Sequence, residues 1–433
     1  MERLPGFRDF YPEPLPNPGV WSADARQYVF GKWREMARRY GFREYDGPPL
    51  EPLELFTTKS GDEIVGQLYN FTDKGERAVA LRPEMTPTLA RMIAAHERNY
   101  KKPIKWFAIP QLFRYERQQK GRLREHFQFN ADLIGETDPA ADAELIALLT
   151  DTLRSFGLTG KDFIIRISSR NAWQEFYELR NARGEVRAGL SREHEFFQVI
   201  DKLERVPTEE SEKKLSVLGF SLEEVNQFIE SGQPTAELKS ILENLAARGM
   251  SEFVKVDYHV VRGLAYYTGV VFEAFDRQGD FRAIAGGGRY DNLIKLISGG
   301  KVNLPALGFG MGDVVLLELL KARGLLQKFG PEKCVYFFIV DETLRAESLR
   351  GIQQLRDWGL SVEYPLVPTK EDKQYKRMRE TNARVLLRLE RNQNGDLQFL
   401  YADPFKHQES FIRAVDKRAL LEKLQGDFES QVI

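Results

Sequence analysis

Apolar residues recur at helical spacing over residues 21–40, WSADARQYVFGKWREMARRY, directly after a proline-rich entry, which predicts a first helix. From there to about residue 135, short strand-like segments alternate with turns, without the β-α-β rhythm of a doubly wound sheet. This pattern favours an antiparallel sheet. Residues 137–160 begin with Thr, Asp and Pro and continue with helical periodicity, so a second helix is expected.

The domain organisation follows from a change of pattern along the chain. Residues 172–250 are charged, helical in pattern and poor in strand formers, whereas the segments on either side favour strands. We therefore expect a helical insertion within a sheet-based domain of residues 1–330. After the breaker QKFGPEKC, strands and amphipathic helices alternate, which predicts a separate small α/β domain over residues 331–433.

The segment 106–135, WFAIPQLFRYERQQKGRLREHFQFNADLIG, predicts two strands joined by a basic loop. Apolar and polar side chains alternate in its second strand, in the order Phe127, Gln128, Phe129, Asn130, Ala131, Asp132 and Leu133. One face is therefore apolar, and the other carries two amides and a carboxylate. Such a polar face either lines a binding site or is exposed to solvent.

Charged residues gather at the mouth of this hairpin: Arg114, Glu116, Arg117, Lys120, Arg122 and Arg124. Guanidinium groups at the rim, with amides and a carboxylate inside, suit a ligand with phosphates at one end and an amino or imidazole group at the other. The chain has no GxxxxGK[ST] motif, and GFGMGD lacks the third glycine of GxGxxG. The phosphates of a bound nucleotide would therefore be held by arginines.

Arg262 stands inside the otherwise strand-like stretch 260–275, VVRGLAYYTGVVFEAF. A guanidinium keeps its charge, so in a largely buried strand it needs an anionic partner. The stretch alone leaves open whether that partner is a protein carboxylate or a charged ligand. Another segment, LRPEMTPTLAR, offers Glu84 and Thr86 at a helix start, where either could simply be a cap.

Composition narrows the possible partners. The net charge is −1, so a nucleic acid would have to be held by local basic patches. The single Cys334 and five scattered histidines give no metal-ligand spacing, and we expect no transition-metal site. No apolar run is as long as a membrane span, and the N-terminus has neither signal-peptide nor transit-peptide character, which predicts a cytoplasmic protein without a membrane segment.

Taken in order, these segments resemble the class II aminoacyl-tRNA synthetases, and within them the histidyl-tRNA synthetase family, over nearly the whole chain. YGFREYDGPPLEPLELF is similar to the first class II motif, FRYERQQKGRLREHFQFNADLIG to the second, and AGGGRYD with PALGFGMG to the third. RPEMT and VRGLAYYTG resemble the two histidine-specific signatures. The resemblance implies an α+β fold, an antiparallel sheet with flanking helices and a helical insertion, followed by an α/β domain like the family's anticodon-binding domain.

The resemblance also implies a histidine–tRNA ligase. Such an enzyme activates L-histidine with ATP and Mg²⁺ to histidyl-adenylate and transfers it to tRNA(His), and it is a homodimer joined through the first motif around Pro48. Its implied catalytic residues are Arg114, on the α-phosphate of ATP and the carbonyl of the amino acid, and Arg262, which assists attack of the histidine carboxylate. Fixed positive charge at oxygens that gain charge suits this chemistry.

The remaining site residues follow from the same resemblance. The histidine-binding residues are Glu84, Thr86 and Gln128 at the α-amino group, Asp132 at the imidazole, and the pocket walls Tyr266 and Tyr267. The ATP-binding residues are Arg114, Glu116, Arg122, His126 and Arg262. The residues expected to contact tRNA lie on a basic helix and are Lys373, Lys376, Arg377 and Arg379.

Two positions depart from the family pattern. Ala265 stands where the family signature carries Asp. Val315 stands where the third motif usually ends in an arginine that lies against the adenine and the γ-phosphate. We expect His126 to stack on the adenine and Arg122, with Arg124, to hold the phosphates instead.

Two other classes of function stay open. One is the catalytically silent relative that serves as regulatory subunit of the ATP phosphoribosyltransferase of histidine biosynthesis. The missing arginine favours it, whereas the C-terminal domain and the joint presence of Arg114, Gln128, Asp132 and Arg262 oppose it. The other is a nucleic-acid-binding module without chemistry, which would rest on KEDKQYKRMRE alone, and a charge run is usually a solvated helix face.

Overall fold

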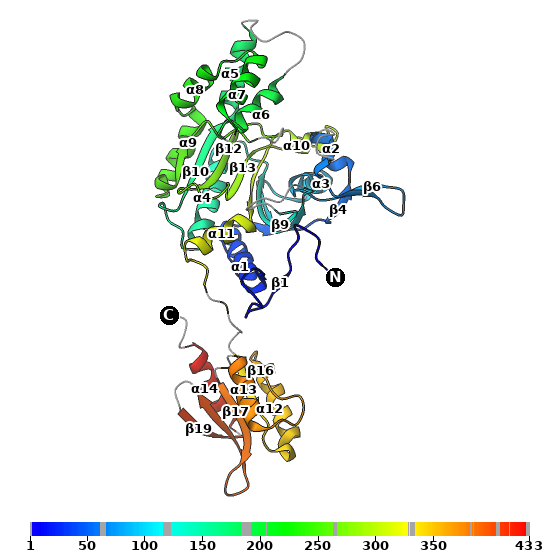
Figure 1. Ribbon diagram of the computed structural model, residues 1–433, viewed down its shortest axis with the longest axis vertical. Helices are drawn as coiled ribbons and strands as arrows, with labels where there is room; N and C mark the ends of the chain where they lie inside the picture. The colour runs from blue at the N-terminus through cyan, green and yellow to red at the C-terminus, as the bar shows by residue number, and fades with distance from the viewer. Residues whose placement is uncertain are drawn as a thin grey trace. The chain divides into compact units, whose positions relative to one another are not determined.

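The structure is a computed structural model that describes residues 2–60, 66–115, 123–182, 192–204, 206–262, 266–327, 329, 334–381, 383, 385–403, 408–414 and 416–429. The chain forms two compact units (Figure 1). The first consists of Met1–Tyr11 and Asn17–Gln327, and the second of Pro12–Pro16 and Lys328–Ile433.

A nine-stranded sheet is the centre of the first unit. Its strands, in spatial order, are β11 (Val254–Val256), β10 (Phe163–Ser169), β12 (Val270–Asp276), β13 (Ala285–Arg289), β14 (Ala306–Gly312), β9 (Glu125–Ile134), β7 (Ile104–Ala108) and β3 (Arg43–Glu44), with β8 (Gln111–Phe113) also paired to β9. Neighbouring strands are antiparallel except at the two ends of the sheet, where β10–β11 and β7–β3 are parallel. The predicted antiparallel sheet is confirmed, apart from these two end pairs.

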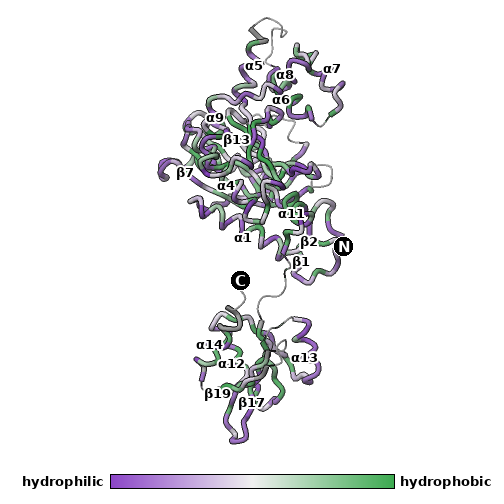
Figure 2. Tube along the Cα trace, turned by 90° about the vertical axis from the view of Figure 1, so that its left-hand side faces the viewer, coloured by the Kyte–Doolittle hydropathy of each residue, from purple (hydrophilic) through white to green (hydrophobic). Residues whose placement is uncertain are grey.

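The apolar face of β9 packs against helices. Trp33 of α1 (Ala23–Arg39) is fully buried and stacks on Phe129, with ring centroids 5.7 Å apart. Helix α4 (Ala140–Arg154) contacts both α1 and β9. Helix α11 (Asp313–Ala322), which follows β14 directly, is hydrophobic along most of its length and contacts β9 as well (Figure 2). This packing leaves the polar face of β9 for the candidate site.

Smaller elements border the sheet. They are β1 (Phe10–Tyr11), β2 (Trp21–Ser22), the three-stranded sheet of β4 (Leu50–Pro52), β6 (Ala78–Leu81) and β5 (Asn70–Thr72), and the helices α2 (Glu54–Ser60), α3 (Thr86–His96) and α10 (Leu293–Ile297). Helices α3 and α10 share a hydrophobic cluster with β7 and the end of β9, through Leu89, Ile93, Leu293, Ile104 and Ile134.

Helices fill the predicted insertion between β10 and β11. They are α5 (Arg170–Ala182), α6 (Glu193–Asp201), α7 (Thr208–Leu218), α8 (Leu222–Ser231) and α9 (Ala236–Ala247). Aromatic rings hold α5, α6 and α8 together: the Trp173 ring lies 5.8 Å from Phe196 and 4.5 Å from Phe228. The insertion thus has its own core.

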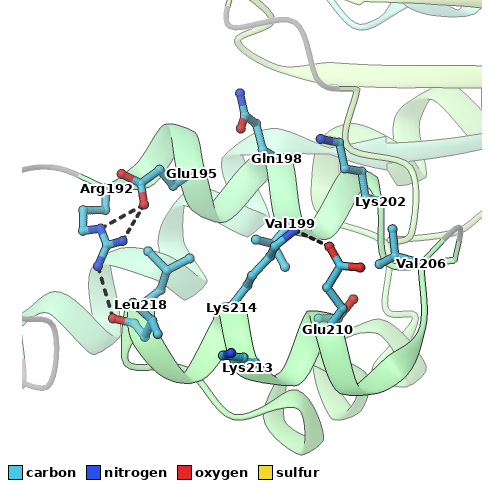
Figure 3. A pocket seen from close by; sticks show the side chains of 12 residues that line it. Arg192, Glu195, Gln198, Val199, Lys202, Val206, Glu210, Lys213, Lys214 and Leu218 are labelled. Atoms are coloured by element: carbon cyan, nitrogen blue, oxygen red, sulfur yellow. Dashed lines mark hydrogen bonds and ion pairs between the residues drawn. The ribbon is translucent and has the colours of Figure 1, made fainter.

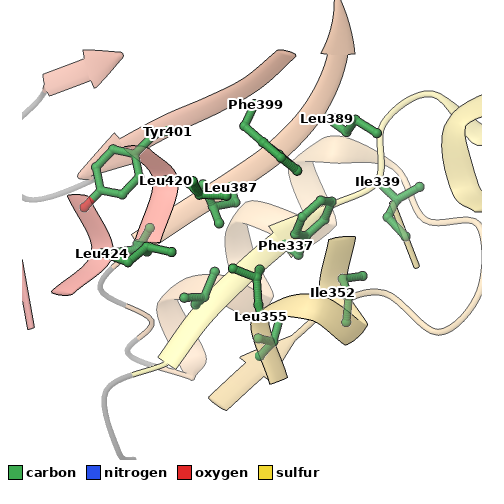
Figure 4. Packing of buried hydrophobic residues seen from close by; sticks show 13 residues of the cluster. Phe337, Ile339, Ile352, Leu355, Leu387, Leu389, Phe399, Tyr401, Leu420 and Leu424 are labelled. Carbon is green, nitrogen blue, oxygen red and sulfur yellow. The ribbon is translucent and has the colours of Figure 1, made fainter. Parts of the chain in front are cut away.

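The second unit is a five-stranded sheet with helices on both faces. The strand order is β16 (Ser361–Glu363), β15 (Cys334–Phe338), β17 (Val385–Arg391), β18 (Leu397–Asp403) and β19 (Gln408–Arg413). Alternate residues of β15 face opposite sides, so Phe337 packs with α12 (Arg345–Asp357) and α14 (Lys417–Glu429), as Figure 4 shows. Phe338 packs on the other side with Met378 of α13 (Glu371–Glu380). The predicted α/β character is confirmed.

Two predicted strands differ from the structure. The stretch 260–275 is a strand only from Val270, and Arg262 lies outside it with φ of 60°. That angle is incompatible with an extended strand, which explains the difference. The first strand of the predicted hairpin is divided into β7 and β8 around Pro110, which has no N–H for a continuous ladder.

Candidate functional site

The site is built on the polar face of β9. Asn130 and Asp132 point from this face and are only 5% and 4% exposed, and Gln128 is half-buried. Exposure to solvent is therefore wrong as an explanation of the predicted alternation. Buried polar side chains need partners, and Asn130 finds one by donating from Nδ2 to the Gln128 carbonyl oxygen at 3.1 Å.

Glycines on the two neighbouring strands make room for these side chains. A methyl group on Gly308 of β14 would collide with the Asp132 carboxylate, and one on Gly310 would collide with the Gln128 side chain. On β13, a methyl group on Gly286 would collide with the Arg262 guanidinium. We call the surface of β13 and β14 next to these side chains the floor of the site. The glycines of AGGGRYD and PALGFGMG therefore leave space on this floor for long polar side chains.

Arg262 reaches this floor from an irregular segment. Its guanidinium forms an ion pair with Glu273 of β12, and its carbonyl oxygen accepts a hydrogen bond from Arg170 Nη1 at 3.1 Å. A non-glycine residue at φ of 60° is strained, and Arg170 holds that backbone in place. The Arg262 Nε is buried and has no hydrogen-bond partner among the described residues.

A cavity of about 210 Å³ is lined both by residues of the predicted hairpin and by Arg262. The residues that line it are Arg114, Leu123, His126, Gln128, Arg262, Arg282, Ala283, Ile284, Ala285, Gly286, Gly310, Gly312, Val314 and Val315. Arg114 is anchored by its Nε, which donates to the Pro83 carbonyl oxygen at 3.0 Å. The structure thus brings together Arg114, His126, Gln128 and Arg262, as the sequence predicts.

Two tyrosine–carboxylate pairs continue the site along the same face. The Tyr290 hydroxyl donates to Asp132 Oδ1 at 2.5 Å, and the Tyr266 hydroxyl donates to Glu84 Oε2 at 3.0 Å. The two tyrosine rings meet edge to face with centroids 6.0 Å apart. Burial raises the pKa of Asp132 to about 7, although the Tyr290 hydrogen bond opposes this. Burial also raises the pKa of both tyrosines, so they remain neutral donors.

Tyr267 connects the tyrosine pairs to the cavity. Its buried ring lies 4.8 Å from the Tyr266 ring and 5.7 Å from the Arg262 guanidinium carbon. Thr86 is the first residue of α3, two residues after Glu84, and is partly buried. Glu116, Arg122 and Ala265 lie outside the described residues. In the second unit, the predicted tRNA-binding residues Lys373, Lys376, Arg377 and Arg379 are all exposed on α13.

Three site residues were missed from the sequence: Glu273, Arg282 and Tyr290. A signal existed for Glu273, because it is the lone carboxylate in the apolar strand VVFEAF and Arg262 requires an anion nearby. Arg282 and Tyr290 flank the glycine run of FRAIAGGGRYD, but neither is part of a periodic pattern. Their positions follow from the pairing of β13 with its neighbours.

A network of buried charges connects the N-terminal segment to two elements that border the cavity. Arg8 donates from Nε to Glu125 Oε1 at 2.7 Å and from Nη1 to Asp313 Oδ2 at 2.8 Å. Asp313 also accepts the Phe127 N–H at 3.0 Å. The N-terminal segment is thereby tied to the starts of both β9 and α11. Because these charges are buried and mutually paired, we assign them a structural role.

A larger cavity, of about 500 Å³, lies between α6 and α7 in the insertion (Figure 3). Four of its charged residues form short-range ion pairs, Arg192 with Glu195 at 2.6 Å and Lys214 with Glu210 at 2.5 Å. Such exposed pairs are typical of a solvated surface. We therefore place the chemistry in the smaller cavity.

Two further observations concern partners. Nowhere in the described ranges do three His, Cys, Asp or Glu side chains form a group that could hold a metal ion. No helix in the described part of the chain is both long and apolar enough to span a membrane.

Comparison with known proteins gives consistent relatives. The family profile described as Histidyl-tRNA synthetase matches residues 20–312. A protein of Opitutus terrae named histidine–tRNA ligase is 47% identical over 403 residues, which cover 89% of this chain and 90% of that protein. The chloroplastic/mitochondrial histidine–tRNA ligase of Arabidopsis thaliana is 38% identical over 398 residues, with coverage of 88% and 79%. The crystal structure of histidyl-tRNA synthetase from Nostoc sp. PCC 7120 has a similar fold, with a TM-score of 0.74 at 22% identity over 96% of this chain and 98% of that chain.

Proposed function

The chain belongs to the histidyl-tRNA synthetase family, and on that premise we propose how its residues perform the family's reaction. It is a histidine–tRNA ligase, which activates L-histidine with ATP and transfers it to tRNA(His). The observation that carries the assignment of the site is the meeting of Arg114, Arg262 and Gln128 in one cavity, with the buried carboxylate Asp132 on the same face of β9 as Gln128.

The histidine side chain is recognised at Asp132. The carboxylate accepts an imidazole N–H, while Tyr290 holds the carboxylate in a fixed orientation through its 2.5 Å hydrogen bond. An apolar side chain of similar size would leave the buried Asp132 without this partner, which costs about 1–3 kcal/mol for the unsatisfied group. The α-amino group binds to Glu84, Thr86 and Gln128.

Arg114 and Arg262 act on the reacting groups. Arg114 binds the α-phosphate, and the Arg262 guanidinium stabilises the oxygens that gain charge. A histidine carboxylate oxygen forms a bond to the α-phosphorus, the bond from that phosphorus to the bridging oxygen breaks, and pyrophosphate leaves with the electron pair. Glu273 keeps Arg262 in position before the substrates arrive.

ATP extends from this point toward Leu123, His126 and Val315. His126 lines the cavity and offers a ring that can stack on adenine. Glu116 and Arg122, which lie outside the described residues, complete the proposed ATP site. Mg²⁺ arrives bound to the phosphate oxygens of ATP, as part of the substrate.

The second unit contacts tRNA(His) through α13. Its residues Gln374 and Met378 face the unit's interior, whereas the four basic side chains named above are exposed. A cluster of exposed cations is what binding to a phosphate backbone requires. We further infer a homodimer, and a cytoplasmic location, where the tRNA and ATP that the reaction uses are present.

The regulatory-subunit alternative has less support, because relatives that are 47% and 38% identical over 89% and 88% of this chain are named histidine–tRNA ligases. Aminoacylation of total tRNA with each amino acid in turn tests the proposed function. We expect charging with histidine alone. Charging with a different amino acid, or with none, would contradict the proposal.

A further inference from the structure

The cavity has a third arginine whose role the family's reaction does not assign. Arg282 lines the same cavity as Arg114 and Arg262, and it comes from the turn between β12 and β13. Its side chain is exposed, which places it at the rim. An exposed arginine is usually only solvated, so a role must rest on its neighbours.

The guanidinium groups of Arg114 and Arg262 do not balance all the negative charge of a bound triphosphate. A triphosphate carries several negative charges, and Arg262 is already neutralised in part by Glu273. Arg114 uses its Nε to bind the Pro83 carbonyl oxygen. Helix α11 contributes only the apolar Val314 and Val315 to the cavity. Arg282 is the third guanidinium among the described residues that line the cavity, and it can add positive charge for the β- and γ-phosphates.

The turn that carries Arg282 is fixed at both of its ends. On the β12 side, the Arg277 N–H donates to the Asp162 carbonyl oxygen at 2.9 Å, and its Nη2 donates to the Glu252 carbonyl oxygen at 2.8 Å. On the β13 side, the Ile284 N–H donates to the Ala274 carbonyl oxygen at 2.8 Å. These bonds limit the motion of the backbone at both ends of the turn, so less backbone entropy is lost when Arg282 binds a ligand.

We propose that Arg282 binds the β- and γ-phosphates of ATP and then the departing pyrophosphate. The inference rests on the proposed function and adds a residue to its site. When the bond between the α-phosphorus and the bridging oxygen breaks, that oxygen keeps the electron pair and the pyrophosphate gains a negative charge. Arg282 stabilises that charge, while Arg114 and Arg262 remain on the adenylate side.

The test is histidine-dependent exchange of pyrophosphate into ATP, measured on the full chain with Arg282→Ala and Arg282→Lys. For Arg282→Ala we expect the KM for ATP and the KM for inorganic pyrophosphate each to rise about tenfold or more, because a charged hydrogen bond to phosphate is removed. The KM for histidine, and histidine affinity measured without ATP, stay within about twofold of wild type. Arg282→Lys keeps the charge and should fall between the two proteins.

Arg98→Ala is the matched control, because Arg98 is an arginine of the same unit with a side chain that is 95% exposed and does not line the cavity. It should leave all three KM values unchanged. If Arg282→Ala keeps wild-type KM values for ATP and pyrophosphate, or raises the KM for histidine equally, the inference is overturned. If wild type itself shows no exchange, both the inference and the proposed function fail, which is a distinguishable result.

Discussion

At the scale of single residues, selectivity depends on Asp132. Its carboxylate is buried, its pKa lies near 7 because of that burial, and it accepts a hydrogen bond from the Tyr290 hydroxyl. Near neutral pH a small change in pH therefore changes how much of this group is ionised. Only the ionised form accepts an N–H at both oxygens, so substrate recognition should titrate with it.

We predict that binding of triazolylalanine, a histidine analogue whose ring stays neutral at these pH values, weakens as the pH falls from 7.5 to 5.5. Asp132 must be ionised to accept the ring N–H, so below its pKa of about 7 binding has to release the carboxyl proton. The dissociation constant should then rise by about 25-fold over this range, and the slope approaches tenfold per pH unit only at its acid end. Isothermal titration calorimetry without ATP measures it.

Asp132→Asn is the control for this experiment, since it keeps the size of the side chain and removes the titration. Its affinity should be weaker and should not change with pH, while the KM for ATP stays near the wild-type value. A flat profile for wild type would remove Asp132 from the imidazole site.

At the scale of elements, the glycines of β13 and β14 leave the space that the polar side chains of the site occupy. We predict that Gly308→Ala displaces the Asp132 carboxylate, because the added methyl group has no room. The expected cost is about 1–3 kcal/mol in the free energy of unfolding, as for other overpacked sites, with a large loss of histidine activation. Thermal melts and pyrophosphate exchange measure the two effects.

Gly31→Ala is the control for this prediction. Gly31 lies in α1, where a methyl group meets no atom within 4 Å, so the change should be neutral or stabilising by up to about 1 kcal/mol. Equal melting temperatures for Gly308→Ala and wild type would show that the floor of the site tolerates a side chain.

Helix α13 supports a second prediction at this scale. Replacing Lys373, Lys376, Arg377 and Arg379 together with glutamine should weaken tRNA charging and flatten its dependence on salt, by up to about 0.7 in the logarithmic slope for each phosphate group that is no longer bound. Histidyl-adenylate formation should be unchanged. The control is Arg350→Gln, an exposed arginine on α12. If adenylate formation falls as much as charging, α13 has a structural role.

How far sequence predicts the site is clearest from β9 and Arg262. Strict alternation over 127–133 identified the polar face, because side-chain direction in a strand depends only on position. The ion pair between Arg262 and Glu273 was missed although Glu273 is the lone carboxylate of its strand, because the backbone angle φ of 60° that brings Arg262 to it is not encoded in a local pattern. Arg282 lies in a turn, where periodicity carries no information.

At the scale of the whole molecule, sequence patterns predicted an antiparallel sheet in the first unit and an α/β arrangement in the second, and the structure confirms both. The parallel pairs β10–β11 and β7–β3 were missed, because the strands of each pair lie far apart in the chain. The helical insertion separates the first pair, and residues 45–103 separate the second. Such pairing is decided by tertiary contacts rather than by local sequence.

Assembly is the prediction that belongs to this scale. Strands β4 and β5 are the edges of the three-stranded sheet and expose Leu50 (38%) and Phe71 (52%), which suits a subunit boundary. We expect a homodimer joined around Pro48–Phe56, with twice the 49.9 kDa chain mass by light scattering at micromolar concentration. Leu50→Asp should shift it toward monomer.

Leu179→Asp, at an exposed leucine of the insertion, controls for the added charge and should leave the mass unchanged. A monodisperse wild-type monomer would contradict the dimer.

The most direct measurement is ATP–pyrophosphate exchange by the wild-type chain with each of the standard amino acids in turn. The cavity lined by Arg114 and Arg262, beside the buried Asp132, predicts exchange with histidine and background rates with all others. Exchange with another amino acid would show that Asp132 does not select the side chain. Absence of exchange with every amino acid would show that the arginines do not catalyse adenylate formation, and a regulatory subunit would then be the better description.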